Sequence, residues 1–293
     1  MPGPVAARLG DGRRLHLQHG PIDLIIEATG TGQAVRDACA AAAERFDGLL
    51  ETLVADLPFL RTRLRPSSPL PAGPVARRMV RAVRPFCADC FVTPMAAVAG
   101  AVADEILAAM TAVAPLRKAY VNNGGDVAIH LAPGESFTAA MFAVRGSDLG
   151  RLRLKPPDGI GGMATSGQGG RSLSLGIADS VTVLAESAAR ADVAATLIAN
   201  AVDLPDHPGI AREAASALQP DSDLGDRLVV TGVPRLSPAE TGTALRSGAQ
   251  RAKTMIDGGL IEAAALFLQG EVLTEGEPMS RYQQLEGADH AGA

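Results

Sequence analysis

The residues of this chain most suited to chemistry are an acid and a hydroxyl in the segment Ala191-Asp192-Val193-Ala194-Ala195-Thr196. The pattern of residues 187–200 predicts a helix capped by Ser187, and on a helix Asp192 and Thr196 share one face. Carboxylate and hydroxyl oxygens are ligands that Mg²⁺ prefers, with water and substrate phosphate in the remaining positions. The pair therefore indicates a magnesium site.

A glycine-dense stretch at residues 161–171 precedes this helix and contains five glycines, a Thr-Ser pair and an Arg. Such a stretch can present many backbone N–H groups and hydroxyls, which together bind phosphate or another anion. We therefore expect a phosphate-binding loop here, followed by a β-strand at residues 181–184. The alternative is that the glycines only serve tight turns.

Two other acidic segments are candidates for ligand contacts. Residues 120–131 predict a strand, a tight turn at Asn123-Gly124-Gly125-Asp126 and a second strand. Asn-Gly favours a hairpin turn, so this segment also has a purely structural explanation. Residues 220–226 hold three acids but lack the distal Glu of a calcium-binding loop.

Taken in order, three segments resemble successive motifs of the ApbE-type FAD:protein FMN transferases. They are Asn123-Gly124-Gly125-Asp126, Met163-Ala164-Thr165-Ser166-Gly167 and Ala191-Asp192-Val193-Ala194-Ala195-Thr196. Two further runs resemble those of an uncharacterised branch of this ApbE-like superfamily: Val92-Thr93-Pro94-Met95-Ala96-Ala97-Val98-Ala99-Gly100 and Ser222-Asp223-Leu224-Gly225. The resemblance covers about residues 85–270, and its strength lies in the order and spacing of the motifs.

The resemblance implies a ligand set. Magnesium would be held by Asp192, Thr196 and the carbonyl of Ala164, and it would grip the pyrophosphate of FAD or the phosphate of FMN. The residues implied in cofactor binding are Asn123, Gly124, Gly125, Asp126, Thr165, Ser166, Gly167 and Asp223. No catalytic nucleophile is identifiable in the sequence.

Two departures from the transferases affect flavin transfer more than metal binding. The transferases place a His-containing segment and a Pro-x-Thr-Gly-x-Pro loop after the Ser-Gly motif, whereas this chain continues directly through residues 172–179 into the strand. Ala99 also stands where the resemblance places a lysine. Part of the flavin-transfer site is therefore missing.

Irregular alternation of helices and strands, with hairpin signals and no regular βαβ repeat, predicts an α+β fold. As in the ApbE-like superfamily, we expect helices packed on a largely antiparallel sheet. Residues 1–273 would form one domain, or two closely packed halves at 1–120 and 121–273, before a flexible tail at 274–293. The expected helices cover residues 33–55, a segment starting at Thr93-Pro94, 210–218 and 237–256; the other expected strands lie within 14–26, 137–144, 149–154 and 260–268.

Composition limits the classes of partner. The chain of 293 residues has a net charge of −5 and no Trp, which argues against nucleic-acid binding. Its N-terminus lacks a recognisable export signal, and Asp104 and Glu105 interrupt the apolar stretch 91–113, so we expect a cytoplasmic protein without a membrane span. Cys87 and Cys90 have C-x-x-C spacing without a second metal-binding pair, which favours a structural or incidental role.

The sequence leaves three functions open. The first is Mg²⁺-dependent binding of a phosphate-bearing nucleotide or coenzyme of flavin type, with group transfer or pyrophosphate chemistry. The second is a non-catalytic flavin or pterin-like coenzyme carrier or assembly factor, and the third is a structural subunit without a ligand. The ring system of the ligand, the presence of catalysis and a homo-oligomeric state are not decided by the sequence.

Overall fold

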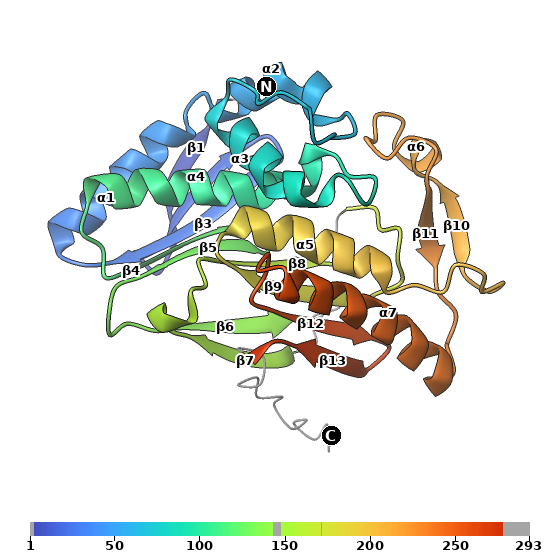
Figure 1. Cartoon of the computed structure of the whole chain (residues 1–293). Helices are drawn as coiled ribbons and strands as arrows, with labels where there is room; N and C mark the ends of the chain where they lie inside the picture. Colours follow the sequence, from blue (N-terminus) through green and yellow to red (C-terminus); the bar gives the residue numbers. More distant parts are fainter. Residues whose placement is uncertain (1–2, 143–147, 171, 278–293) are drawn as a thin grey trace, which may run out of the picture.

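The computed structural model describes residues 3–142, 148–170 and 172–277, and its framework is one antiparallel sheet (Figure 1). Apolar residues along the strands give every strand except the exposed edge strand Val5–Arg8 a buried side. Within the described residues the sheet contains nine strands. Their order across the sheet is β1 (Val5–Arg8), β2 (Leu15–His19), β3 (Ile22–Thr29), β4 (Lys118–Asn123), β5 (Asp126–Leu131), β8 (Gly162–Ser166), β9 (Ser180–Ala185), β12 (Ala263–Leu268) and β13 (Glu271–Glu275).

The longer helices lie together on one face of this sheet (Figure 1). They are α1 (Gly32–Phe46), α2 (Leu49–Leu60), α3 (Pro74–Val83), α4 (Val98–Val113), α5 (Ala188–Ala201) and α7 (Pro238–Asp257). A hairpin of β6 (Phe137–Phe142) and β7 (Asp148–Leu154) lies on the other face, next to a short 3-10 turn at Pro156–Asp158. The expected α+β fold, with helices on an antiparallel sheet, is confirmed.

The two faces of the sheet belong to different hydrophobic cores, because successive side chains of a strand point in opposite directions. Val121, Ala128 and Val183 join the core beneath the helices. Val127 and Met163 belong to a second core on the helix-free face. Whether a candidate site residue is an odd or an even number of positions from these residues therefore decides on which face of the sheet its side chain lies.

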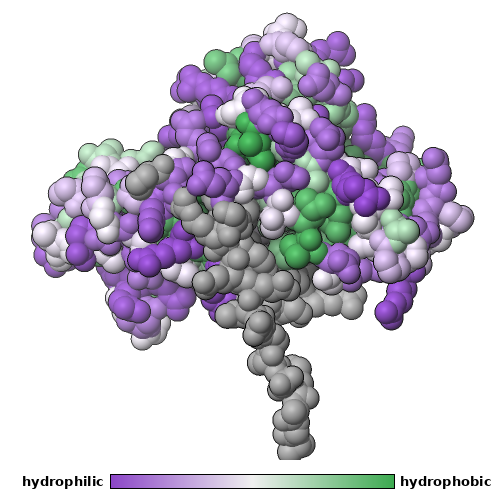
Figure 2. Space-filling view, turned by 60° about the horizontal axis from the view of Figure 1, so that its bottom comes forward, coloured by the Kyte–Doolittle hydropathy of each residue, from purple (hydrophilic) through white to green (hydrophobic). Residues whose placement is uncertain are grey.

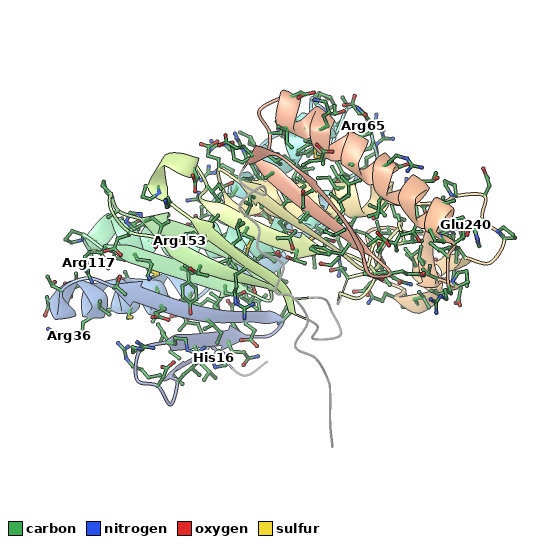
Figure 3. The ribbon with its side chains drawn as sticks, turned by 90° about the horizontal axis from the view of Figure 1, so that it is seen from below. His16, Arg36, Arg65, Arg117, Arg153 and Glu240 are labelled. Carbon is green, nitrogen blue, oxygen red and sulfur yellow. The ribbon has the colours of Figure 1, made fainter. Side chains whose placement is uncertain are left out.

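The helix-free face is mixed in character. Figure 2 shows hydrophobic residues in separate groups among hydrophilic ones on this side of the molecule. His16 of β2, labelled in Figure 3, pairs with Asp23 of β3 across 2.7 Å between Nε2 and Oδ1. This polar pair lies on the exposed side of the two strands.

The start of α5 lies unusually close to the sheet and to α4. A Cβ atom on Gly100 would lie 2.3 Å from the carbonyl oxygen of Ala188, and one on Gly162 would lie 2.0 Å from the nitrogen of Ala188. Real Cβ atoms do not approach a backbone so closely, so only glycine fits at these positions. Two glycines thus fix the position of the helix that carries Asp192 and Thr196.

A carboxylate holds the same helix start. Asp104 of α4 accepts hydrogen bonds from the backbone nitrogens of Ala188 at 3.0 Å and Ala189 at 2.9 Å. These N–H groups lie in the first turn of α5, where the helix itself offers no acceptor. A negative side chain also suits the positive end of the helix dipole.

The apolar stretch before β4 is a core helix. Pro94–Val113 is long and apolar enough to cross a membrane by length and composition. In the structure it comprises a 3-10 turn at Pro94–Ala97 followed by α4, which packs against α1, α5, β4 and β5. Buried Ile106 and Met110 belong to the main hydrophobic core, as the expectation of a buried helix requires.

An arm, which we define as residues 211–232, extends beyond the sheet at one side of the molecule (Figure 1). It consists of β10 (Ala211–Ala214), the short α6 (Ala215–Leu218), a connecting loop and β11 (Leu228–Gly232). Strands β10 and β11 pair with each other outside the main sheet. The strands of the arm are attached to the body by Arg212, which donates to the Leu175 carbonyl and to Asp203, and by the nitrogen of Val230, which donates to the Ser174 carbonyl.

Three expected elements differ from the structure. The helix predicted at 33–55 is two helices, because Gly48 turns the chain at a φ of 69° and α2 then continues past Pro58. The helix predicted at 210–218 is divided equally between the strand β10 and the short helix α6, each of four residues. The loop predicted at 161–171 begins as the strand β8, since the glycines at its start serve close packing.

The tail boundary and one early strand also differ. The tail was expected from residue 274, but Thr274 lies within β13, which pairs with β12. Residues 278–293 of the expected tail lie outside the described residues. Strand β1 was not expected from the sequence, and strands from both expected halves of the chain join the same sheet.

We predict that Gly162→Ala destabilises the protein, because the new methyl group must displace the backbone at Ala188. The free energy of unfolding should fall by about 1–3 kcal/mol, the usual range for overpacking, in urea unfolding followed by circular dichroism. Gly10→Ala is the matched control, since no atom lies within 4 Å of a Cβ there. Equal stability of the two variants would contradict the close approach of α5.

Candidate functional site

A cavity of about 310 Å³ lies where three parts of the fold meet: the turn before α4, the middle of α5 and the loop of the arm. Its polar lining includes Asp126, Asp192, Thr196 and Asp223. Its apolar lining includes Met95, Leu173 and Leu224. The volume is at the lower end of the range for ligand pockets, which typically combine apolar walls with a few polar groups.

Helix α5 presents Asp192 and Thr196 to this cavity. The helix is capped as predicted, with the Ser187 hydroxyl accepting from the nitrogen of Arg190. Asp192 and Thr196 are one turn apart and both line the cavity. The structure thus brings together the acid and the hydroxyl that the sequence singled out.

The carboxylate of Asp192 is held by the backbone at the start of α4. Its Oδ2 accepts a hydrogen bond of 3.0 Å from the nitrogen of Gly100. Burial raises the pKa of Asp192 well above its usual range, and the nearby charge of Asp126 raises it further, whereas the N–H groups of Gly100 and Ala99 act in the opposite direction. Without a cation beside it, the Asp192 carboxyl group therefore favours its neutral form.

Asp126 begins β5 and lies on the helix side of the sheet, 9% exposed. Its Oδ1 accepts from the nitrogen of Thr165 at 3.3 Å. Asn123, at the end of β4, donates from Nδ2 to the carbonyl of Ala99 at 3.1 Å and so supports the start of α4. Asp126 thus lines the cavity, and Asn123 supports the helix beside it.

The two glycines between them lie elsewhere. Gly124 and Gly125 form the turn with φ values of 66° and 116°. They line a different hollow together with His16 and Asn122. Their structural role is evident, and their role in cofactor binding stays a prediction.

The segment Ala164-Thr165-Ser166-Gly167 is not among the described residues that line the cavity. Ala164 is completely buried in β8. The Thr165 side chain lies on the helix-free face, where its Oγ1 is 3.0 Å from Oγ1 of Thr182. The metal role of Ala164 and the phosphate roles of the other three residues therefore stay predictions. The sheet lies between the side chain of Thr165 and that of Asp192.

Several lining residues were not selected as site residues from the sequence. Among them are Met95 and Ala96 from the turn before α4, Ala99 from the start of α4, and Gln219 and Ser222 from the arm. The sequence did contain an indication of these residues before and at the start of α4, because they belong to the run at residues 92–100 that resembles the ApbE-like branch. Thr93 in this run begins the helix as predicted, but its hydroxyl does not cap it.

The donors at Asp192 and Thr196 fit an open magnesium site. No group of three or more His, Cys, Asp or Glu side chains in the described part of the chain could hold a metal ion. A carboxylate that accepts backbone N–H bonds keeps lone pairs for a cation, and Mg²⁺ commonly binds through one or two protein ligands plus water and phosphate. The residues present thus suit a cation that shares its coordination with a ligand.

With its nine-stranded antiparallel sheet and one layer of helices, the protein has an ApbE-like fold. The crystal structure of the ApbE protein from Thermotoga maritima superposes with a TM-score of 0.53 and 13% identity, covering 93% of this chain and 99% of that one. The chain belongs to the family described as AbpE bacteria, whose model matches residues 6–274.

Two curated relatives come from archaea. The UPF0280 protein of Methanocella arvoryzae is 35% identical over 167 residues, covering 56% of this chain and 65% of the relative. The UPF0280 protein of Methanopyrus kandleri is 37% identical over 165 residues, covering 56% and 64%. The matches thus span less than two thirds of the length of these relatives.

We predict that Asp104→Ala lowers stability because it leaves the N–H groups of Ala188 and Ala189 without their acceptor. The loss should be about 1–3 kcal/mol in urea unfolding. In Asp104→Asn the amide oxygen can accept from only one of the two nitrogens, so this variant should keep part of the stability that the alanine variant loses. If Asp104→Ala is as stable as the original protein, the carboxylate does not hold the start of α5.

Proposed function

We propose that the cavity binds a phosphate-bearing coenzyme through a divalent cation held by Asp192 and Thr196. The observation that carries the proposal is the charge of the lining. Three carboxylates, those of Asp126, Asp192 and Asp223, line the cavity, and the described lining contains no Lys, Arg or His. A phosphate would be repelled by this surface unless a cation stood between them.

The start of α5 offers no substitute for the cation. Helix N-termini often bind phosphate through free N–H groups. Here the carboxylate of Asp104 accepts from the nitrogens of Ala188 and Ala189 and occupies that position. Binding of a phosphate in this cavity is therefore expected to depend strictly on the metal.

Magnesium is the cation we propose, because the available donors are a carboxylate and a hydroxyl. When bound, it would neutralise phosphate oxygens and stabilise charge on a leaving group. The flavin nucleotides FAD and FMN are the proposed ligands, since the motifs of this chain resemble those of flavin-transferring enzymes. A cytoplasmic location, which the sequence predicts, belongs to the same proposal.

A coenzyme carrier without group transfer is the second candidate. The specific observation in its favour is that Ala99, at the position of the family's lysine, lines the cavity and offers only a methyl group there. The described lining also contains no cysteine that could act as a nucleophile. Binding with no conversion of FAD would support the carrier, and release of AMP would support a transferase or hydrolase.

We predict that Asp192→Asn removes the magnesium-dependent part of nucleotide binding. The amide keeps the shape and can accept from Gly100, but it loses the charge that binds the cation. Affinity for FAD, FMN or ADP in the presence of Mg²⁺ should fall at least 10- to 100-fold, roughly the effect of disturbing even the outer shell of a metal site. Isothermal titration calorimetry with and without Mg²⁺ measures this change.

Asp206→Asn is the matched control for this substitution, because Asp206 is an exposed aspartate outside the cavity. It should leave the affinity and its dependence on Mg²⁺ unchanged. Unaltered Mg²⁺-dependent binding by Asp192→Asn would show that the metal site has been placed at the wrong residue.

Thr196 provides a second test of the same site. Thr196→Val keeps the β-branched shape but removes the hydroxyl, so we predict weaker Mg²⁺-dependent binding with little change in melting temperature. Thr196→Ser restores the hydroxyl and should recover most of the affinity in the same titrations. A valine variant that binds as tightly as the original protein would remove Thr196 from the ligand set.

A further inference from the structure

The arm closes the cavity on the side opposite α5. Its loop contributes Gln219, Ser222, Asp223 and Leu224 to the lining, whereas α5 contributes Asp192 and Thr196. Ligand groups that extend beyond the proposed metal therefore meet residues of the arm. The polar side chains of this loop therefore determine which chemical groups of a ligand can bind at this end of the cavity.

Contacts to the body hold the arm loop at three points. Arg61 donates to Asp221 at 2.9 Å, and the guanidinium carbon of Arg227 lies 3.2 Å from the centre of the Phe91 ring. Between them, the Thr93 hydroxyl donates to the Asp223 carboxylate. Because Thr93 is only 2% exposed, the third contact fixes Asp223 from the interior of the fold.

The carboxylate of Asp223, which lines the cavity, can accept further hydrogen bonds. Thr93 donates to Oδ2, and a carboxylate has about four acceptor positions in total. The nearby arginines are engaged elsewhere, with Arg61 on Asp221 and Arg227 over Phe91, and the described residues give Asp223 no ion pair. Among the described residues, the carboxylate is thus positioned without a cationic partner.

Asp223 does not share a three-acid metal site with the other acids of the cavity. The described residues contain no group of three acids that could share one ion, so Asp126, Asp192 and Asp223 do not form a common site. A fixed carboxylate without a cation is suited to accept hydrogen bonds from hydroxyl groups. The same chemistry recognises ribose hydroxyls in dinucleotide-binding folds, where an acidic residue accepts from them.

We propose that Asp223 binds the hydroxyl groups of a ribose or ribityl chain whose phosphate is held by the cation at Asp192 and Thr196. The proposal rests on the proposed function, because it needs the phosphate at the other end of the cavity. Asp223 is then a specificity-determining residue for the polyhydroxyl part of the ligand. Thr93 is a positioning residue that acts through it.

The test compares nucleotides with and without these hydroxyls, all in the presence of Mg²⁺. Calorimetry on the full chain uses ADP, 2′,3′-dideoxy-ADP and FMN as probes. The original protein should bind ADP more tightly than dideoxy-ADP if the ribose lies at Asp223. In Asp223→Ala, ADP should bind about 10- to 100-fold more weakly, as for a hydrogen bond to a charged group, and the preference over dideoxy-ADP should disappear.

The titration with FMN distinguishes the two sources of hydroxyl groups, the ribose and the ribityl chain. If the ribityl chain lies at Asp223, the alanine variant should lose affinity for FMN and keep its affinity for ADP. Thr93→Val should cause a smaller loss for the same ligand, because Asp223 remains but is less well positioned. Asp226→Ala is the matched control on the same loop, since the exposed Asp226 accepts from the Ser216 hydroxyl within the arm and is not part of the described lining.

Two outcomes would overturn the proposal in different ways. If Asp223→Ala binds both ADP and FMN as tightly as the original protein, while Asp192→Asn loses Mg²⁺-dependent binding, only the role of Asp223 is wrong. If the original protein binds none of the probes with Mg²⁺, the proposed function fails and this inference fails with it. Circular dichroism of each variant separates a local effect from a loss of fold.

Discussion

The close approach of α5 to the sheet and to α4 is the constraint on which the candidate site depends. The first turn of α5 lies so near Gly100 and Gly162 that a side chain at either position would overlap the backbone at Ala188. Asp104 then binds the free N–H groups of this turn. With its start fixed, the helix can present Asp192 and Thr196 only toward the turn before α4.

The same arrangement explains the electrostatics of the cavity. Bringing α5 against α4 and β5 places Asp192 near Asp126 and Asp104, and burial together with these charges raises its pKa. A fold does not normally gather carboxylates without a counter-charge, because desolvation makes each ionised group costly. A divalent cation bridging Asp192 to a phosphate would compensate this charge, which is why metal and ligand are proposed together.

Local patterns predicted much of this architecture from the sequence. Ser187 caps α5, and the Ser237–Glu240 capping box begins α7, because both depend on residues within one turn. The face of Thr165 could not be predicted, since a glycine-dense stretch gives no sign that it starts as a strand whose side chains alternate between two cores. The contact between Thr93 and Asp223 joins residues 130 positions apart, and no local pattern encodes such a pairing.

The motif resemblance and the structure therefore contribute different parts of the site. The resemblance selected Asp192, Thr196, Asp126 and Asp223, and these are the members that line one cavity. The most direct measurement of the central claim is the anomalous scattering of Mn²⁺ in crystals grown with ADP. We predict one peak at about 2.0–2.3 Å from both the Asp192 carboxylate and the Thr196 hydroxyl, with a phosphate oxygen as a further ligand. A peak elsewhere, or bound ADP in the cavity with no metal beside Asp192, would contradict the account.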